Sequence, residues 1–178
     1  MKTLAFDTET HSIRPGMLAP RLVCSSWSDG RVLDREQTLP AIRDALQQAA
    51  KRELLLVGHN IAYDFGVVCA EWPELIPLVF AALDADGVSD TLIRHMLHDI
   101  AKGTVSPGSL ADLSEKYLGK HLEKENTWRL RYWELDGRPL ASWPPEALEY
   151  ARKDAETTLA VWHAQKNPAD EFPQVRAA

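Results

Sequence analysis

Residues 3–10 read T-L-A-F-D-T-E-T, a short apolar run that leads into acids and threonines. The apolar half, residues 3–6, is typical of a short buried strand. In an extended chain, side chains two residues apart point to the same face, so Asp7 and Glu9 project together. Adjacent carboxylates repel each other unless a cation lies between them. This stretch therefore predicts a strand that runs into a metal-binding site.

The rest of the chain predicts more strands, with helices between and after them. Asp29-Gly30 is a hairpin signal between two apolar segments. The predicted further strands cover residues 22–27, 31–34, 54–57 and 88–90. Apolar spacing and start and stop signals predict helices over residues 39–52, 61–72, 74–85, 91–98, 109–118 and 145–166. This order favours an α/β fold, with a central mixed five-stranded sheet flanked by helices.

Two later segments place an acid in a helix with an apolar face. Residues 58–64, G-H-N-I-A-Y-D, put Asn60 and Asp64 four residues apart, on one side of a helix start. Asp64 interrupts an apolar stretch, where an acid without a partner is costly to bury. Residues 150–154, Y-A-R-K-D, put Tyr150 and Asp154 on one face of the last long helix.

Each segment also has a purely structural explanation. An Asp-x-Glu pair after a strand is often a solvated turn, and Asn60 could serve only as an N-cap. Tyr150 could be a packed ring beside an exposed Asp154. The three segments in this order are much more specific than any one of them.

Together, the three segments resemble the exonuclease motifs of the DEDD superfamily, which implies a ribonuclease-H-like fold. One branch has a histidine five residues before the last aspartate, where this chain has Glu149. Tyr150 matches the other branch, DEDDy, which includes proofreading domains of family A DNA polymerases and RNase D-type ribonucleases. The resemblance spans roughly residues 3–166. Residues 109–119 resemble polymerase proofreading domains, and residues 128–132 resemble phage-type family A polymerases.

The resemblance implies an activity and a set of catalytic residues. The expected reaction is two-metal-ion hydrolysis that removes nucleoside monophosphates from the 3′ end of single-stranded or frayed DNA. Asp7, Glu9 and Asp154 are expected to surround one cation, and Asp7 and Asp64 to hold the other. Ligands that are all oxygen suit Mg²⁺ or Mn²⁺. Tyr150 is expected to orient the attacking water.

The resemblance also implies contacts with the strand. The backbone amides near Thr8 and Thr10 are expected to bind the terminal nucleotide, and Ile13 to wedge against its base. Asn60 is expected to touch the substrate or to brace the helix of Asp64. Aromatic stacking holds bases without regard to sequence, and the pattern leaves open which aromatic residue reaches the strand: Trp128, Tyr132 or Trp133.

Composition limits the function classes. The formal net charge is −6, which argues against a module that coats duplex nucleic acid by electrostatics alone. Cys24 and Cys69 form no zinc-binding pattern. No signal peptide or membrane span is evident, which favours the cytoplasm, a host cytoplasm if the chain is phage-encoded. Residues 1–166 are expected to form the exonuclease domain. Residues 167–178 are expected to be a linker, or the start of a helix, towards an absent polymerase domain.

Two alternatives stay open at this point. The first is an RNase D-like RNA 3′→5′ exonuclease, which would use the same chemistry on another substrate. The second is an inactive nuclease-like module that only binds nucleic acid. Such modules usually lose a carboxylate, whereas Asp7, Glu9, Asp64 and Asp154 are all present.

Overall fold

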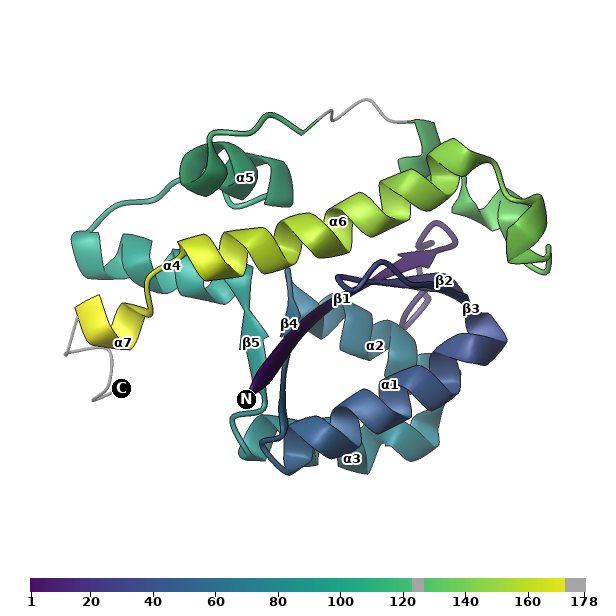
Figure 1. The fold of residues 1–178 in the computed structure, drawn as a ribbon, viewed down its shortest axis with the longest axis horizontal. Helices are drawn as coiled ribbons and strands as arrows, with labels where there is room; N and C mark the ends of the chain where they lie inside the picture. The colour runs from purple at the N-terminus through teal and green to yellow at the C-terminus, as the bar shows by residue number, and fades with distance from the viewer. Residues whose placement is uncertain (123–126, 172–178) are drawn as a thin grey trace.

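The computed structural model describes residues 1–122 and 127–171, which form an α/β fold around one five-stranded sheet (Figure 1). The strand order is β3-β2-β1-β4-β5. The strands are β1 (Lys2–Thr10), β2 (Leu22–Trp27), β3 (Val32–Asp34), β4 (Leu54–Gly58) and β5 (Val88–Asp90). Strand β2 pairs antiparallel with both β1 and β3. Strand β4 pairs parallel with both β1 and β5. The predicted mixed sheet is thus confirmed.

The central strand β1 is longer than the sequence predicted. Its first half, Lys2 to Ala5, pairs with β4, and its second half, Phe6 to Thr10, pairs with β2. Pairing with β2 therefore keeps the acidic half in the sheet, beyond the apolar run on which the prediction rested. As a result Asp7 and Glu9 lie within the strand rather than in a turn after it.

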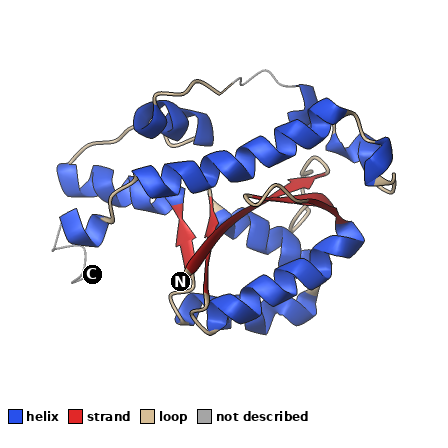
Figure 2. Ribbon diagram, viewed as in Figure 1, coloured by secondary structure: helices blue, strands red, loops and turns tan. Residues whose placement is uncertain are grey.

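Helices cover both faces of this sheet (Figure 2). One face carries α1 (Arg35–Ala50), α2 (Ile61–Glu71) and α3 (Ile76–Asp84), and the other carries the long α6 (Pro145–Ala164). The helices α4 (Thr91–Lys102), α5 (Leu110–Leu118) and α7 (Pro168–Glu171) lie beside α6 or its C-terminal end. No helix in the described part of the chain is long and apolar enough to cross a membrane.

Alternation along β1 separates two parts of the core. Leu4 and Phe6 belong to the cluster beneath α1, α2 and α3. Ala5 lies between them in sequence and packs in the cluster that includes Leu159 and Trp162 of α6. Odd-numbered residues of β1 therefore face α6, and even-numbered residues face α2, because successive side chains alternate between the faces of a strand.

Several helix boundaries differ from the sequence prediction because of local capping. Helix α1 begins four residues early, since the Asp34 side chain accepts a 2.8 Å hydrogen bond from the Gln37 amide. Helix α4 continues beyond residue 98 and ends at Gly103, whose φ of 66° suits a helix stop. Helix α5 has the predicted extent, with Ser109 and Gly119 as its caps.

The segment between α5 and α6, for which no elements were predicted, contains short 3₁₀ helices. They are η2 (Thr127–Leu130), η3 (Tyr132–Leu135) and η4 (Leu140–Ser142), and a further one, η1 (Pro73–Leu75), precedes α3. The helical pattern noted towards the C-terminus begins in α7, and residues 172–178 lie outside the described part of the chain.

Asp90, at the end of β5, joins two helices to the sheet. Its carboxylate accepts hydrogen bonds from the amides of Asn60 and Ile61, at the start of α2, at 3.2 and 2.7 Å. It also accepts hydrogen bonds from Leu92 and Ile93, at the start of α4, at 2.7 and 3.1 Å. One buried acid therefore caps two helix N-termini, where a negative charge is favourable.

Replacing Asp90 with Ala should lower the free energy of unfolding by about 2–4 kcal/mol, because amides of two helices lose their acceptor. Urea unfolding followed by circular dichroism measures the change. Asp84→Ala, at an exposed position on α3, serves as the control and should change stability by less than about 0.5 kcal/mol. Equal effects of the two substitutions would contradict the double-capping role.

Candidate active site

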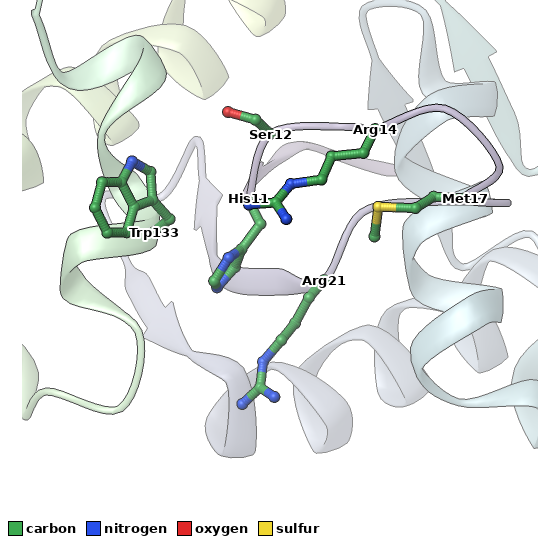
Figure 3. A pocket seen from close by; sticks show the side chains of 6 residues that line it. All are labelled: His11, Ser12, Arg14, Met17, Arg21 and Trp133. Carbon is green, nitrogen blue, oxygen red and sulfur yellow. The ribbon is translucent and has the colours of Figure 1, made fainter.

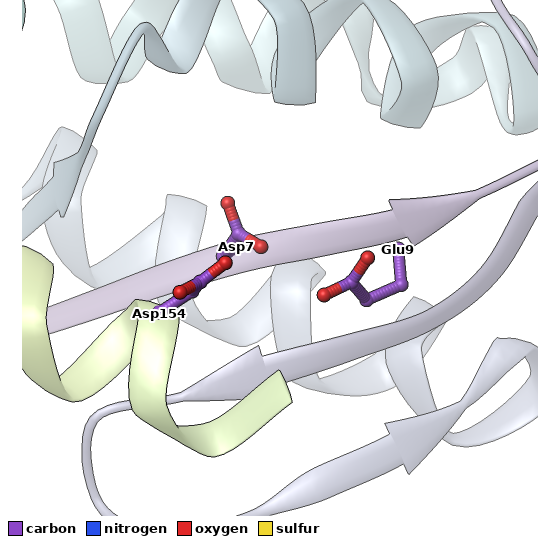
Figure 4. Close-up of side chains that lie close together, drawn as sticks. All are labelled: Asp7, Glu9 and Asp154. Carbon is purple, nitrogen blue, oxygen red and sulfur yellow. The ribbon is translucent and has the colours of Figure 1, made fainter. Parts of the chain in front are cut away.

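Three carboxylates converge on the α6 side of β1 (Figure 4). Asp7 and Glu9 are odd-numbered residues of the strand, on the same face as Ala5. Asp154 reaches them from α6. A carboxylate oxygen of each residue lies within 4.8 Å of one from each of the others. The alternation of β1 and the packing of α6 thus bring together acids that are far apart in sequence.

Asp64 approaches from the opposite face of the sheet. It lies in the first turn of α2, is buried, and is not part of the group of three. Its Oδ1 accepts hydrogen bonds from the Thr8 amide at 3.0 Å and from the Thr8 hydroxyl at 2.6 Å. Thr8 is an even-numbered residue of β1 and therefore faces α2. It joins Asp64 to the strand between Asp7 and Glu9.

The electrostatics of this cluster favour a bound cation. Burial raises the pKa of Asp7 well above its ordinary value, and the charges of Asp64, Glu9 and Asp154 raise it further. Burial also raises the pKa of Asp64 to about 7, although its bonds from Thr8 act in the opposite direction. Carboxylates in this arrangement are poorly compensated by the protein itself. An oxygen-rich, acidic set of this kind fits a divalent cation such as Mg²⁺ or Mn²⁺.

Two tyrosines pack beside the carboxylates. Tyr150 lies one turn before Asp154 on α6, and its ring centroid is 6.3 Å from that of Tyr132 on η3. Tyr132 is buried, and its hydroxyl donates a 2.7 Å hydrogen bond to the Ala147 carbonyl. Burial, followed by the charge of Glu9, raises the pKa of Tyr132. Tyr132 is therefore a neutral wall of the site that supports the ring of Tyr150.

The predicted substrate residues lie around this cluster. Thr8 is buried, with its amide and hydroxyl both bonded to Asp64, whereas the Thr10 hydroxyl lies 3.0 Å from the Tyr63 hydroxyl. Ile13 is 60% exposed in the loop after β1. Asn60 is exposed, and its side chain makes no capping bond to α2, so the simple N-cap explanation does not apply. Their contacts with a strand stay predictions.

The sequence patterns did not reveal the positioning roles of Thr8 and Asp90. Thr8 was expected to bind substrate. Its place between Asp7 and Glu9 in the sequence gives no sign that it donates hydrogen bonds to a third acid, Asp64. The sequence placed Asp90 between a predicted strand and a predicted helix, but it could not show that Asp90 caps α2, because that contact joins residues 30 positions apart.

Two comparisons with known proteins bear on the identity of this site. Residues 1–167 match the model of a family described as 3′-5′ exonuclease. The chain belongs to the 3′-5′ exonuclease family. Its motifs are those of the DEDD type, whose members use divalent metals, and the acidic cluster on β1 is the matching feature of this structure. No curated protein sequence matches the chain.

Solved structures with the same fold include other exonucleases. The Nibbler EXO domain of Aedes aegypti is 18% identical at a TM-score of 0.62, covering 96% of this chain and 80% of that one. NrnC of Brucella melitensis bound to pGG is 15% identical at a TM-score of 0.66, and the match covers 99% of this chain and 77% of NrnC. RNase D of Escherichia coli, an exoribonuclease, is 22% identical at a TM-score of 0.62. This match covers 98% of the present chain and 41% of RNase D. These likenesses show a ribonuclease-H-like exonuclease fold.

Divalent cations should stabilise this exonuclease more at pH 8 than at pH 5. The raised pKa of Asp64 makes a destabilising contribution without metal that is absent below its ordinary pKa of 3.8 and grows as the pH rises to about 7, where the buried group ionises. A cation binds the ionised form and offsets this loss. At pH 8, Mn²⁺ at about 100 times its Kd should raise Tm by roughly 5–10 °C.

Thermal unfolding at both pH values, with and without Mn²⁺, measures this difference. Asp7→Asn should remove most of the Mn²⁺ effect and raise the Tm of the metal-free protein at pH 8, because it relieves repulsion. A Mn²⁺ effect of the same size at pH 5 and pH 8 would contradict the role of the buried carboxylates.

Thr8→Val should weaken the site without disrupting the strand, because valine keeps the shape and the backbone amide but removes the 2.6 Å hydroxyl bond to Asp64. Loss of such a supporting bond typically costs 10- to 100-fold in metal affinity or activity. Manganese titration of both proteins measures the change. Thr3→Val, on the same strand but away from the acids, should leave the affinity unchanged.

Proposed function

We propose that this domain removes nucleoside 5′-monophosphates from the 3′ end of single-stranded or frayed DNA, as a proofreading exonuclease does. The observation that carries the proposal is the meeting of Asp7, Glu9 and Asp154 on one face of β1, with Asp64 held by Thr8 from the other. The DNA substrate, the polymerase partner and a phage origin rest on the resemblance of residues 109–119 and 128–132 to polymerase proofreading domains.

The proposed site holds two divalent cations. Asp7, Glu9 and Asp154 would ligate one cation, and Asp7 and Asp64 the other, with Asp7 shared between them. Asp64 comes from the α2 side of β1, but its charge is the largest of those that raise the pKa of Asp7, so the two carboxylates lie near each other. When bound, such cations supply Lewis-acid stabilisation of the charge that develops on the phosphate and the leaving oxygen. The raised pKa of Asp7 supports this assignment, because a cation lowers the cost of ionising a crowded carboxylate.

The reaction is a hydrolysis. The oxygen of a water molecule forms a bond to the terminal phosphorus, and the bond from phosphorus to the 3′ oxygen of the preceding nucleotide breaks. The leaving oxygen takes up a proton, so the shortened strand ends in a 3′ hydroxyl and a nucleoside 5′-monophosphate is released. Tyr150 is one turn from Asp154, and we assign its hydroxyl to holding the attacking water in position.

Around this centre, Thr10, Ile13 and Asn60 are the proposed contacts of the terminal nucleotide. Ile13 and Asn60 are exposed, which leaves their side chains accessible to a strand. Thr8 is also a proposed contact of the terminal nucleotide. In the structure, its amide and hydroxyl donate hydrogen bonds to Asp64.

A second candidate substrate is RNA. The solved structures of similar fold include RNase D of Escherichia coli, whose description is that of an exoribonuclease involved in structured RNA processing. Both substrates use the same carboxylates, so the rate on each one distinguishes the two candidates.

Incubation of 5′-labelled single-stranded DNA and RNA of one sequence with Mg²⁺ or Mn²⁺ tests the proposal. We expect stepwise shortening from the 3′ end, faster on DNA. Asp154→Asn should slow it roughly 100- to 10,000-fold, because a ligand worth several kcal/mol in the transition state is lost. Glu156→Gln, exposed on the same helix, is the matched control and should retain full activity.

Three results would change the proposal. Absence of shortening of either substrate would overturn the exonuclease activity. Equal shortening by Asp154→Asn would overturn the site. Faster cleavage of RNA would replace the DNA substrate with the second candidate.

A further inference from the structure

A cavity of about 350 Å³ lies directly beyond the end of β1 (Figure 3). Its walls come from the loop that follows the strand and from η3. The lining residues are His11, Ser12, Arg14, Met17, Arg21 and Trp133. His11 follows Glu9 by two residues, which is about 7 Å along a strand. The cavity is therefore adjacent to the carboxylate cluster but separate from it.

The element η3 connects the carboxylate site with this cavity. Tyr132 points inward and is buried beside the carboxylates, whereas Trp133, the next residue, is 51% exposed and lines the cavity. Trp128 is partly buried and packs on Tyr132 at 6.3 Å between ring centroids. Of the three aromatic residues that the sequence left open, Trp133 is the one whose ring is available to stack on a base.

A partly exposed acid, Asp136, links the two walls of the cavity. The Asp136 carboxylate, at the end of η3, lies 3.0 Å from His11 Nε2 and accepts a 2.9 Å bond from Arg21 Nε. This contact fixes the loop of Arg21 against the element that carries Trp133. The indole of Trp133 and the guanidinium of Arg21 therefore lie on walls of the cavity that this contact links.

Arg14 supplies a positive charge to the cavity. Its guanidinium makes no ion pair or hydrogen bond within residues 1–122 and 127–171, in contrast to Arg21. No acid is among the six lining residues. Asp136 offsets the charge of Arg21, so the guanidinium of Arg14 is the group in the cavity wall that can attract a phosphate in this acidic chain.

We propose that this cavity is a subsite for the single strand on the 5′ side of the scissile bond, with a base stacked on Trp133 and a backbone phosphate on Arg14. An aromatic platform beside a cation is the arrangement by which proteins hold single strands of any sequence. The proposed function puts the terminal nucleotide over the carboxylates, so the adjacent cavity is assigned to a nucleotide of the remaining strand. This subsite rests on the proposed function. It assigns to Trp133 and Arg14 a role in substrate affinity.

The first test compares a strand with a mononucleotide. Trp133→Ala should raise KM for a ten-residue oligothymidylate roughly tenfold, within the range that base stacking contributes, and leave kcat within about twofold. Trp133→Phe should retain most of the affinity. Inhibition by thymidine 5′-monophosphate, which represents the terminal nucleotide, should be unchanged in both variants.

The second test requires no catalysis. Fluorescence anisotropy of the labelled oligothymidylate in EDTA, over a series of salt concentrations, measures binding alone. Arg14→Ala should reduce the slope of log affinity against log salt by about 0.7, the value for one phosphate contact on a single strand. Phe80→Ala and Arg43→Ala, on α3 and α1 at the opposite face of the sheet, are the matched controls and should bind like the unmodified protein.

Unchanged strand binding in both Trp133→Ala and Arg14→Ala would overturn the subsite. If these variants lost inhibition by thymidine 5′-monophosphate together with strand affinity, the subsite would also be overturned. The cavity would then hold the terminal nucleotide. If the unmodified protein hydrolyses nothing, the proposed function fails, and the anisotropy measurements still decide whether the cavity binds a strand.

Discussion

Repulsion among buried carboxylates is the constraint on which the rest of this structure depends. Asp7 lies on the central strand, and its pKa is raised by burial and by the charges of Asp64, Glu9 and Asp154. Such an arrangement costs folding free energy, so the remainder of the protein has to hold the acids in place. The same cost is what makes the cluster receptive to divalent cations, because a bound cation removes it.

The central strand β1 holds these carboxylates in place. Alternation of side chains on β1 sends Asp7 and Glu9 towards α6 and Thr8 towards α2. Pairing with β4 along its first half and with β2 along its second half anchors the strand in the sheet. Thr8 then carries the contact to Asp64 through two hydrogen bonds, so that one short segment arranges acids that arrive from both faces of the sheet.

Beyond β1, the surrounding elements connect the carboxylate cluster with the neighbouring cavity. Asp90 anchors the start of α2, and hence Asp64, by capping two helices at once. The short element η3 carries Tyr132 inward to the carboxylates and Trp133 outward to the cavity. A region for which the sequence predicted no helix or strand thus lines both the carboxylate cluster and the neighbouring cavity.

The sequence by itself determined the sheet and most helices and indicated which acids to expect in a site, since these depend on local signals such as apolar runs, Gly119 as a stop and acids spaced along one face. It could not show that Asp90 caps α2, that Thr8 serves Asp64, or which aromatic ring stays exposed. Those facts depend on contacts between residues distant in the chain, and only tertiary packing decides them. Trp133 and Tyr132 are neighbours in sequence, yet the packing of η3 against β1 and α6 buries one and exposes the other.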